Sequence, residues 1–333
     1  MPITEPPFWY RAPGAISAAL SPAGEVYAAI GRLRRRRADP PALPCPLICV
    51  GNLVAGGSGK TPIALDLAQR LAHQGWTPAI LSRGHGGQLR GPLRVDPAVH
   101  RAAQVGDEPL LHARACSAWV ARDRAKGALA AAADGADVVI MDDGLQNPTV
   151  RPDLPIVVVD GRRGFGNGRV IPAGPLREPI DAGLARAVAA IIVGPDTAGC
   201  TDRIAPNLDG PILTARFEPA DDVHALSGMR VVAFAGIAQP NAFFQMIRDG
   251  GADLAFAQSF PDHHRFSRAE IAALQARATR LGARLVTTEK DQVRLPPAAA
   301  GVVTTVSRRL IWDDPAAIDA LVAAALIESD AAG

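Results

Sequence analysis

The stretch "GNLVAGGSGKTP", from Gly51 to Pro62, comes close to the phosphate-binding loop pattern G-x-x-x-x-G-K-[ST], with Val54 in place of the first glycine. The apolar run "PLICV" before it is typical of a short strand, and "IALDLAQRLAHQG" after it has the periodicity of a helix that ends at Gly75. A glycine-rich loop in this position points backbone N–H groups and a helix N-terminus at phosphate. The context therefore predicts a nucleotide site. A tight glycine turn followed by a surface lysine is the alternative.

The residues of this loop have different expected tasks. Lys60 is expected to reach the terminal phosphates of the nucleotide, and the Thr61 hydroxyl is expected to bind Mg²⁺. The glycines let the backbone wrap closely around the phosphates. Pro62 is compatible with the first turn of a helix, where its missing N–H has no partner. The predicted nucleotide-binding residues are Val54, Ala55, Gly56, Gly57, Ser58, Gly59, Lys60 and Thr61.

A second motif supplies carboxylates for the metal. The segment "DVVIMDDG" has the composition of a buried strand and ends in Asp142 and Asp143. Adjacent side chains on a strand point in different directions, so one carboxylate is expected to hold Mg²⁺, directly or through water. The other is expected to face the substrate or a basic neighbour, and the sequence does not decide which is which. An ordinary Asp-Gly turn is the alternative.

Strand-like and helix-like segments alternate along the chain. The segments "TPAILS", "DVVIMDD", "LPIVVVD" and "AVAAIIVG" are almost entirely apolar. They predict an α/β P-loop NTPase fold, a mostly parallel sheet covered by helices, with ligands at the carboxyl ends of the strands. A second alternating set begins near "MRVVAFAGIA". We therefore expect a P-loop nucleotide-binding core over residues 41–210 and a smaller C-terminal α/β lobe over residues 223–330.

The composition is that of an ordinary globular protein. The chain has 333 residues, 48% of them hydrophobic and 20% charged, and its net charge of +2 gives no reason to expect nucleic acid as a partner. Four cysteines without a C-x-x-C pair, and no secretory signal, favour a reducing cytosol. No apolar segment approaches the ~20 residues that a membrane-spanning helix needs, so none is predicted.

Residues 1–40 nevertheless have an unusual pattern, because the aromatic run "PPFWY" precedes the arginine-rich run "GRLRRRR". Between them, apolar residues recur at helical spacing, which predicts a helix with one apolar face and a cationic end. Such a helix can sink its apolar face into lipid headgroups while its arginines meet anionic lipid. A helix docked on its own domain, with solvated arginines, is the alternative. The expected membrane contacts are Trp9, Tyr10, Val26, Ile30 and Leu33, with Arg32, Arg34, Arg35, Arg36 and Arg37.

Six further strings, in this order along the chain, make the sequence resemble one family, the tetraacyldisaccharide 4'-kinases, or lipid A 4'-kinases, of Gram-negative bacteria. The resemblance runs from the aromatic N-terminal segment to the last third of the chain. The strings are "SRGHGG" from Ser82, "VGDEP" from Val105, "DDGLQNP" from Asp142, "PAGPLREP" from Pro172, "FPDHH" from Phe260 and "TTEKDQVRL" from Thr287.

The resemblance implies an activity that the motifs alone do not give. Members of this family transfer the γ-phosphate of ATP, with Mg²⁺, to the 4'-hydroxyl of a tetraacylated glucosamine disaccharide 1-phosphate and so form lipid IVA. The implied setting is the cytoplasmic face of the inner membrane, with peripheral attachment to anionic lipid. A two-lobed fold with the active site in the cleft is implied as well, the smaller lobe closing that cleft. We expect a monomer.

The resemblance also implies a catalytic pair. The aspartate of the "GDEP" motif, here Asp107, acts as the base, with the histidine of the "DH" motif, here His263, beside it. A carboxylate polarised by an imidazole can accept the proton that a sugar hydroxyl loses as it attacks phosphorus. Because the two residues lie far apart in the sequence, closure of the cleft is expected to assemble them. His264 is adjacent, and the sequence does not say which ring turns inward.

Other loops provide further candidates. "PAGPLREP" presents Arg177, expected to stabilise the transferred charge, and Glu178, expected to assist the metal. Arg83 in "SRGHGG" and Gln146 in "DDGLQNP" are expected on the acceptor side. The chain departs from the family pattern at His85, where a tyrosine is usual, and at Ser58, which is more often threonine.

Two other classes of protein compete with a lipid kinase. A regulatory or metal-insertion GTPase normally reads guanine with N-K-x-D, and the nearest string here, "TEKD", has its lysine next to the aspartate. A soluble ATP-dependent ligase with a P-loop is compatible with the nucleotide motifs. It gives no reason for the aromatic, arginine-rich N-terminus.

Overall fold

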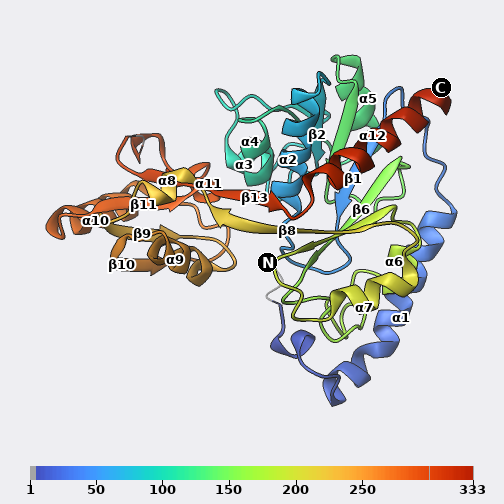
Figure 1. Ribbon diagram of the computed structural model, residues 1–333, viewed down its shortest axis with the longest axis horizontal. Coiled ribbons are helices and arrows are strands. Elements are labelled where there is room, and N and C mark those ends of the chain that lie inside the picture. The colour runs from blue at the N-terminus through green and yellow to red at the C-terminus, as the bar shows by residue number, and fades with distance from the viewer. Residues whose placement is uncertain (1–4, 300, 333) are drawn as a thin grey trace.

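The computed structural model describes residues 5–299 and 301–332, which build two sheets with helices on their faces. Figure 1 shows the larger sheet and its helices as one body, with the smaller sheet projecting from it at the left. The predicted α/β P-loop fold with a mostly parallel sheet is confirmed.

The larger sheet has nine strands, and its neighbouring strands are parallel except for the pair at each edge. In spatial order the strands are β13 (Arg308–Trp312), β8 (Ile212–Pro219), β7 (Ala189–Val193), β6 (Leu154–Asp160), β1 (Leu47–Gly51), β5 (Val138–Asp142), β2 (Pro78–Ser82), β4 (Ser117–Val120) and β3 (Leu93–Arg94).

Alternate residues of the central strands feed two separate cores. Ile48 and Val50 of β1 pack with helix α2 (Lys60–His73) on one face of the sheet. Leu47 and Cys49 point to the opposite face, against helix α5 (Arg124–Ala133). Because both faces are covered, a ligand is expected at the carboxyl ends of the central strands, in the loops that follow them.

The smaller sheet has four parallel strands and is likewise covered on both faces. Helix α9 (Pro240–Asp249) packs on one face and α10 (Arg268–Arg280) on the other. Ser267 and Glu270 form a capping box at the start of α10, as their spacing indicates. The strands, in spatial order, are β10 (Asp253–Ser259), β9 (Arg230–Ala235), β11 (Arg284–Thr288) and β12 (Thr304–Val306).

The end of the chain returns to the larger sheet. Strand β13 pairs with β8, and helix α12 (Pro315–Ala332) packs through Ile318 and Val322 on the core that α2 also covers. The sequence placed this segment in the smaller lobe, residues 223–330. The apolar face of α12 instead finds its partner next to α2, which no local pattern could indicate.

The remaining elements are short and lie mainly in loops. They are η1 (Pro7–Tyr10), α3 (Ala102–Val105), α4 (Asp107–His112), α6 (Ile180–Leu184), α7 (Cys200–Ile204), η2 (Ala205–Asn207), α8 (Asp221–His224), α11 (Glu289–Gln292) and η3 (Pro297–Ala299).

Helix α1 (Ala15–Arg36) lies along the outside of the larger domain (Figure 1) with its small residues inward. A side chain at Gly24 would meet the carbonyl oxygen of Val170 at 2.7 Å, so the helix approaches the domain closely there. Its large apolar residues face outward: Ile30, for example, is 54% exposed. The outward apolar residues are Ile16, Val26, Tyr27, Ile30 and Leu33.

Two of the expected membrane contacts have other positions. Trp9 is buried and donates its Nε1–H to the carbonyl of Pro172, and the guanidinium of Arg163 stacks on Tyr10. These rings hold the N-terminal segment against its own domain. Within the described ranges, no helix is long and apolar enough to cross a membrane.

Candidate active site

The loop between β1 and α2 has the backbone of a phosphate-binding loop. Gly56 and Gly59 have φ of +106° and +88°, a region that favours glycine. Asn52 donates its side-chain amide to the carbonyl of Gly56 at 3.2 Å, and the N–H of Ala55 donates to the carbonyl of Pro175 at 2.7 Å. The loop is thus held in shape by contacts from both sides. Val54 pairs with Leu176 through an isolated antiparallel β-bridge. The residue that replaces the first glycine of the loop pattern therefore adds a contact with the loop that holds Leu176.

Asp142 is the carboxylate at the end of β5 that meets the loop. Its Oδ2 accepts from the Thr61 hydroxyl at 2.9 Å and lies 3.3 Å from Nε2 of His112. Its Oδ1 is buried and has no hydrogen-bond partner among the described residues. A threonine hydroxyl beside a carboxylate with an unpartnered oxygen fits Mg²⁺, which takes few protein ligands and completes its shell with phosphate and water oxygens. Thr61 and Asp142 would hold it.

Asp143 turns the other way, with φ of +59°, and meets basic groups. Arg177 donates both terminal nitrogens to its two oxygens, at 2.7 and 3.1 Å, and Nζ of Lys60 lies 3.8 Å from Oδ1. Burial would raise the pKa of Asp143, but Lys60, Arg177 and Arg124 outweigh it and hold that pKa below its usual value. Asp143 is therefore the partner of the phosphate-binding cations.

Two charged residues beside this site have no role in the sequence analysis. Arg124 is 3% exposed and donates to the carbonyl of Ala121; burial, and then Arg83, lowers its pKa to about 10. Burial, and then Asp142, raises the pKa of Glu108 against the attraction of Lys290, His112 and Lys60. Glu108 follows Asp107 within the "GDEP" string, so the motif itself could have indicated it.

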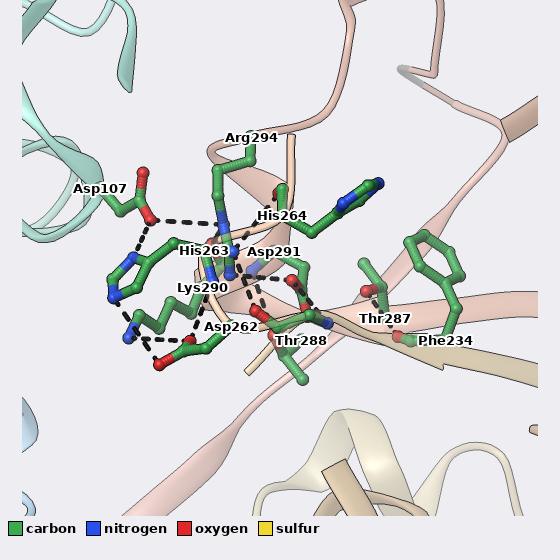
Figure 2. A network of polar contacts seen from close by, with 11 residues as sticks. Asp107, Phe234, Asp262, His263, His264, Thr287, Thr288, Lys290, Asp291 and Arg294 are labelled. Atoms are coloured by element: carbon green, nitrogen blue, oxygen red, sulfur yellow. Dashed lines mark hydrogen bonds and ion pairs between the residues drawn. The ribbon is translucent and has the colours of Figure 1, made fainter. Parts of the chain in front are cut away.

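Asp107 and His263 are in contact, although one comes from α4 and the other from the loop between β10 and α10. Nδ1 of His263 lies 2.8 Å from Oδ2 of Asp107, and Figure 2 shows the two side chains pointing toward each other across the two parts of the chain. His263 has φ of +60°, and its N–H donates to the carbonyl of Gly236. The loop of the smaller lobe thus fixes the ring in place.

Arg294 is a second partner of Asp107 that sequence reasoning did not single out. Its Nε lies 3.4 Å from Oδ2 of Asp107, and its NH2 donates to buried Asp291 at 2.8 Å. Asp291 also accepts from the N–H of Gly236 and from the Thr288 hydroxyl (Figure 2). Arg294 is the next-to-last residue of the segment "TTEKDQVRL", so the string was recognised while the role of its arginine was not.

His264 faces away from Asp107. Its Nε2 lies 3.0 Å from Oε1 of Glu270, and its ring stacks on Phe260 with the centroids 4.7 Å apart. The choice between adjacent histidines therefore falls on His263.

Glu178 is not next to Thr61 and Asp142 in the hydrogen-bond network. Arg186 donates to both of its oxygens at 2.8 Å, and NH2 of Arg35, from the last turn of α1, lies 3.2 Å from Oε2. A carboxylate neutralised by two guanidinium groups is a poor candidate for a metal ligand. The sequence suggested a metal role because Glu178 follows Arg177 directly.

Gln146 links Glu178 to the phosphate-binding side. Its Nε2 donates to Glu178 and to the carbonyl of Asn52, both at 3.0 Å, and its Oε1 accepts from Arg177 at 3.3 Å.

Arg83 lies in the loop after β2, exposed to solvent. Helix α4 connects the two halves of the site, because Asp107 is its first residue and His112, near Asp142, is its last.

Comparison with known proteins found a matching family and similar relatives. Residues 16–326 match the family model described as "Tetraacyldisaccharide-1-P 4'-kinase". A tetraacyldisaccharide 4'-kinase of Rhodospirillum centenum is 52% identical over 330 residues, 98% of this chain and 97% of that protein. One from a Methylobacterium species is 51% identical over 324 residues, 96% of this chain and 97% of that protein.

A solved structure is similar as well. LpxK from Aquifex aeolicus, crystallised in complex with ATP, superposes with a TM-score of 0.75 at 26% identity, covering 93% of this chain and 99% of that one. On this match of sequence over nearly its whole length, the chain belongs to the tetraacyldisaccharide-1-P 4'-kinase family.

Proposed function

We propose that this protein transfers the γ-phosphate of ATP to the 4'-hydroxyl of a tetraacylated glucosamine disaccharide 1-phosphate in lipid A biosynthesis, giving lipid IVA. Membership of the family supports the activity. The observation that carries the chemistry is the contact of Asp107 with His263, joined through α4 to the Thr61–Asp142 pair.

Nucleotide binding is assigned to the loop from Val54 to Thr61. Its backbone N–H groups and the start of α2 hold the phosphates, and Lys60 moves from the carbonyl of Gly56, now 3.5 Å away, to the terminal phosphate oxygens. Thr61 and Asp142 would hold Mg²⁺, which would supply charge neutralisation for the phosphates of the nucleotide. Burial and the charge of Asp142 disfavour the ionised form of Glu108. A cation bound at Asp142 would favour that ionised form.

Asp107 is assigned as the base. Among the described residues its side-chain contacts, with His263 and Arg294, go to Oδ2, so Oδ1 is assigned to the acceptor. Asp107 takes the proton of the 4'-hydroxyl while that oxygen bonds to the γ-phosphorus, the bond from phosphorus to the bridging oxygen breaks, and ADP leaves with its electron pair. His263 and Arg294 keep the carboxylate oriented and stabilise its charge.

Three arginines are assigned to phosphate and acceptor. Arg177, now bidentate on Asp143, stabilises the charge of the transferred group, as does buried Arg124. Arg83, exposed beside the site, is assigned to the acceptor. Gln146 and Glu178 are assigned to hold Arg177 in place, because their polar groups are already used within the protein.

The smaller lobe is proposed to close the cleft. It contributes His263 and Arg294, while Asp107 and the P-loop belong to the larger domain. A base that is complete only when the lobes meet limits hydrolysis of ATP in the absence of acceptor.

Attachment to the membrane surface is assigned to α1, at the cytoplasmic face of the inner membrane. Its apolar residues are exposed while its small residues pack inward, the reverse of a helix that is merely docked on its domain. Arg32, Arg34, Arg36 and Arg37 are exposed at its end and face anionic lipid.

The test is direct. Wild-type protein is incubated with labelled ATP and the lipid disaccharide 1-phosphate in detergent micelles, and separately with GTP alone. We expect acceptor-dependent formation of a bisphosphorylated lipid from ATP. Hydrolysis of GTP without lipid product would instead favour a GTPase, and ADP formation driven by a carboxylated small molecule would favour a ligase.

A further inference from the structure

A cavity of about 620 Å³ lies where the N-terminal segment crosses the loop after β6, away from the residues assigned above to catalysis. It is lined on one side by residues 10–13, which lead into α1. The other side is lined by Arg162, Arg163, Gly166 and Asn167, with Ala198 and, from α7, Arg203. We call it the arginine pocket, because its lining includes Arg11, Arg162, Arg163 and Arg203.

The positive charge of this pocket is only partly neutralised. None of its described lining residues is acidic. Glu5 pairs with Arg163, and Oδ1 of Asp160 accepts from the backbone N–H of Arg162 at 2.9 Å. Over the described part of the chain, the side chains of Arg11, Arg162 and Arg203 form no ion pair. Guanidinium groups gathered in this way repel each other unless an anion joins them.

The pocket is a built feature of the fold. The N–H of Asn167 donates to the carbonyl of Trp9 at 2.7 Å, and the Nε1–H of Trp9 donates to Pro172, so the N-terminal segment is fixed to the loop. Burial raises the pKa of Tyr10 to about 12, Glu5 adding to the shift and Arg163 opposing it. The guanidinium of Arg163 stacks on the Tyr10 ring, so Tyr10 adds a further contact between the N-terminal segment and the loop.

Its position relates it to both the P-loop and the membrane helix. Arg163 reaches Glu5, and Glu5 lies against the P-loop, since a side chain at Gly56 would collide with its Oε1. Glu5 therefore lies between the arginine pocket and the P-loop. On its other side the pocket opens at the start of α1, whose apolar face is exposed.

We propose that the arginine pocket binds the 1-phosphate of the disaccharide acceptor, a phosphomonoester at the opposite end of the sugar from the 4'-hydroxyl. The inference rests on the proposed function, because the family's acceptor carries a phosphate in addition to its acyl chains. Planar guanidinium groups suit phosphate oxygens through paired hydrogen bonds. A phospholipid headgroup has the same chemistry, and the test below separates the two sources.

The test compares two acceptors and two double variants. Arg162→Gln with Arg203→Gln removes two charges from the pocket and spares Arg163, which Tyr10 and Glu5 use. Arg280→Gln with Arg284→Gln is the matched control, because both of these arginines are exposed on the smaller lobe. Each protein is assayed in neutral detergent micelles with the disaccharide carrying the 1-phosphate and with the disaccharide lacking it, and thermal melting checks the fold.

For the acceptor with the 1-phosphate, we expect the pocket variant to raise KM roughly 10- to 100-fold, as the loss of charge-assisted hydrogen bonds implies. Its KM for ATP, and its kinetics with the acceptor lacking the phosphate, should match wild type, and the control should match wild type throughout. Equal KM of wild type for the two acceptors would overturn the inference while leaving the proposed function intact. Equal losses of the pocket variant on both acceptors would overturn it too.

The third arm uses vesicles. If the pocket variant behaves as wild type in neutral micelles and is defective only on vesicles that contain phosphatidic acid, the pocket binds bulk lipid headgroups and the inference is wrong. If wild type phosphorylates neither disaccharide, the proposed function fails and the inference fails with it.

Discussion

Asp142 and Asp143 are neighbours in the sequence with opposite electrostatic surroundings. The first meets Thr61 and His112 and keeps a buried oxygen that has no partner in the described part of the chain, and the second meets Lys60 and Arg177. The motif predicted that the two would differ. It could not assign them, because the partners come from α2, α4 and the loop that holds Arg177, which only the fold brings together.

Glu108 allows a prediction about pH. The pKa of Glu108 is raised in the folded protein. At a pH above that raised pKa the carboxylate is ionised, and its charge destabilises the fold. At a pH low enough to protonate Glu108 in both the folded and the unfolded protein, this effect disappears. We expect Glu108→Gln to melt at a higher temperature than wild type at neutral pH, without nucleotide and Mg²⁺. The difference should shrink as pH falls.

Melting curves across pH measure this effect, with Glu289→Gln as the control, because Glu289 is a second carboxylate whose pKa is raised and it lies away from the P-loop. Only for Glu108 should added Mg²⁺ and ATP reduce the advantage of the glutamine. A Glu108→Gln variant less stable than wild type at every pH would show that its charge stabilises the fold.

Arg35 was expected at the membrane and is instead bound to buried Glu178. Glu178 holds Gln146, and Gln146 holds Arg177. We therefore expect Arg35→Gln to lower kcat about tenfold in detergent micelles, because a charge-assisted contact in the network that positions Arg177 is lost. Binding to vesicles should be nearly unchanged.

Arg36→Gln is the matched control for this prediction, since Arg36 is the next residue of α1 and is exposed. It should weaken binding to anionic vesicles slightly and leave kcat in micelles unchanged. Identical behaviour of the two variants would show that Arg35 has no special link to the site.

At the scale of elements, α1 was predicted as a helix with an apolar face, and the structure adds which face is free. The small residues Ser17, Gly24 and Ala28 are buried, so the helix packs closely on its domain and turns its large apolar residues outward. Periodicity showed that two faces exist. It could not show that the less apolar one packs inward, because that depends on the close approach to Val170.

The exposed arginines of α1 can be tested without disturbing the site. Replacing Arg32, Arg34, Arg36 and Arg37 by glutamate, with Arg35 retained, should weaken binding to anionic vesicles by more than about 100-fold at low salt, at roughly 1 kcal/mol for each charge. Activity on bilayer-embedded acceptor should fall with it, and activity in detergent should remain. Wild-type binding should weaken as salt increases.

Vesicle sedimentation at several salt concentrations makes this measurement. Neutral vesicles are the control, because there the apolar face alone acts and the four substitutions should have little effect. Full sedimentation of the substituted protein with anionic vesicles at low salt would show that these four arginines do not attach α1 to anionic lipid.

At the scale of the whole molecule, the sequence predicted the sheet type, the P-loop and the presence of a second lobe. It missed the return of β13 and α12 to the larger sheet, because antiparallel pairing with β8 and packing beside α2 are long-range choices. It also missed Arg294, since the ion pair with Asp107 exists only where the two lobes meet. The contact of Asp107 with His263 rested on the family resemblance, and the fold supplies its geometry.

The central claim is that Asp107 and His263 form one base assembled from two lobes. The most direct test is a double-mutant cycle on kcat with the lipid disaccharide acceptor, using Asp107→Asn, His263→Ala and both together, with His264→Ala as the control. We predict losses of about 10²- to 10⁴-fold for each single variant, nearly the same loss for the pair, unchanged KM for ATP and near wild-type activity for His264→Ala. Losses that multiply in the double variant would contradict the claim, because they would mean that the two residues act independently.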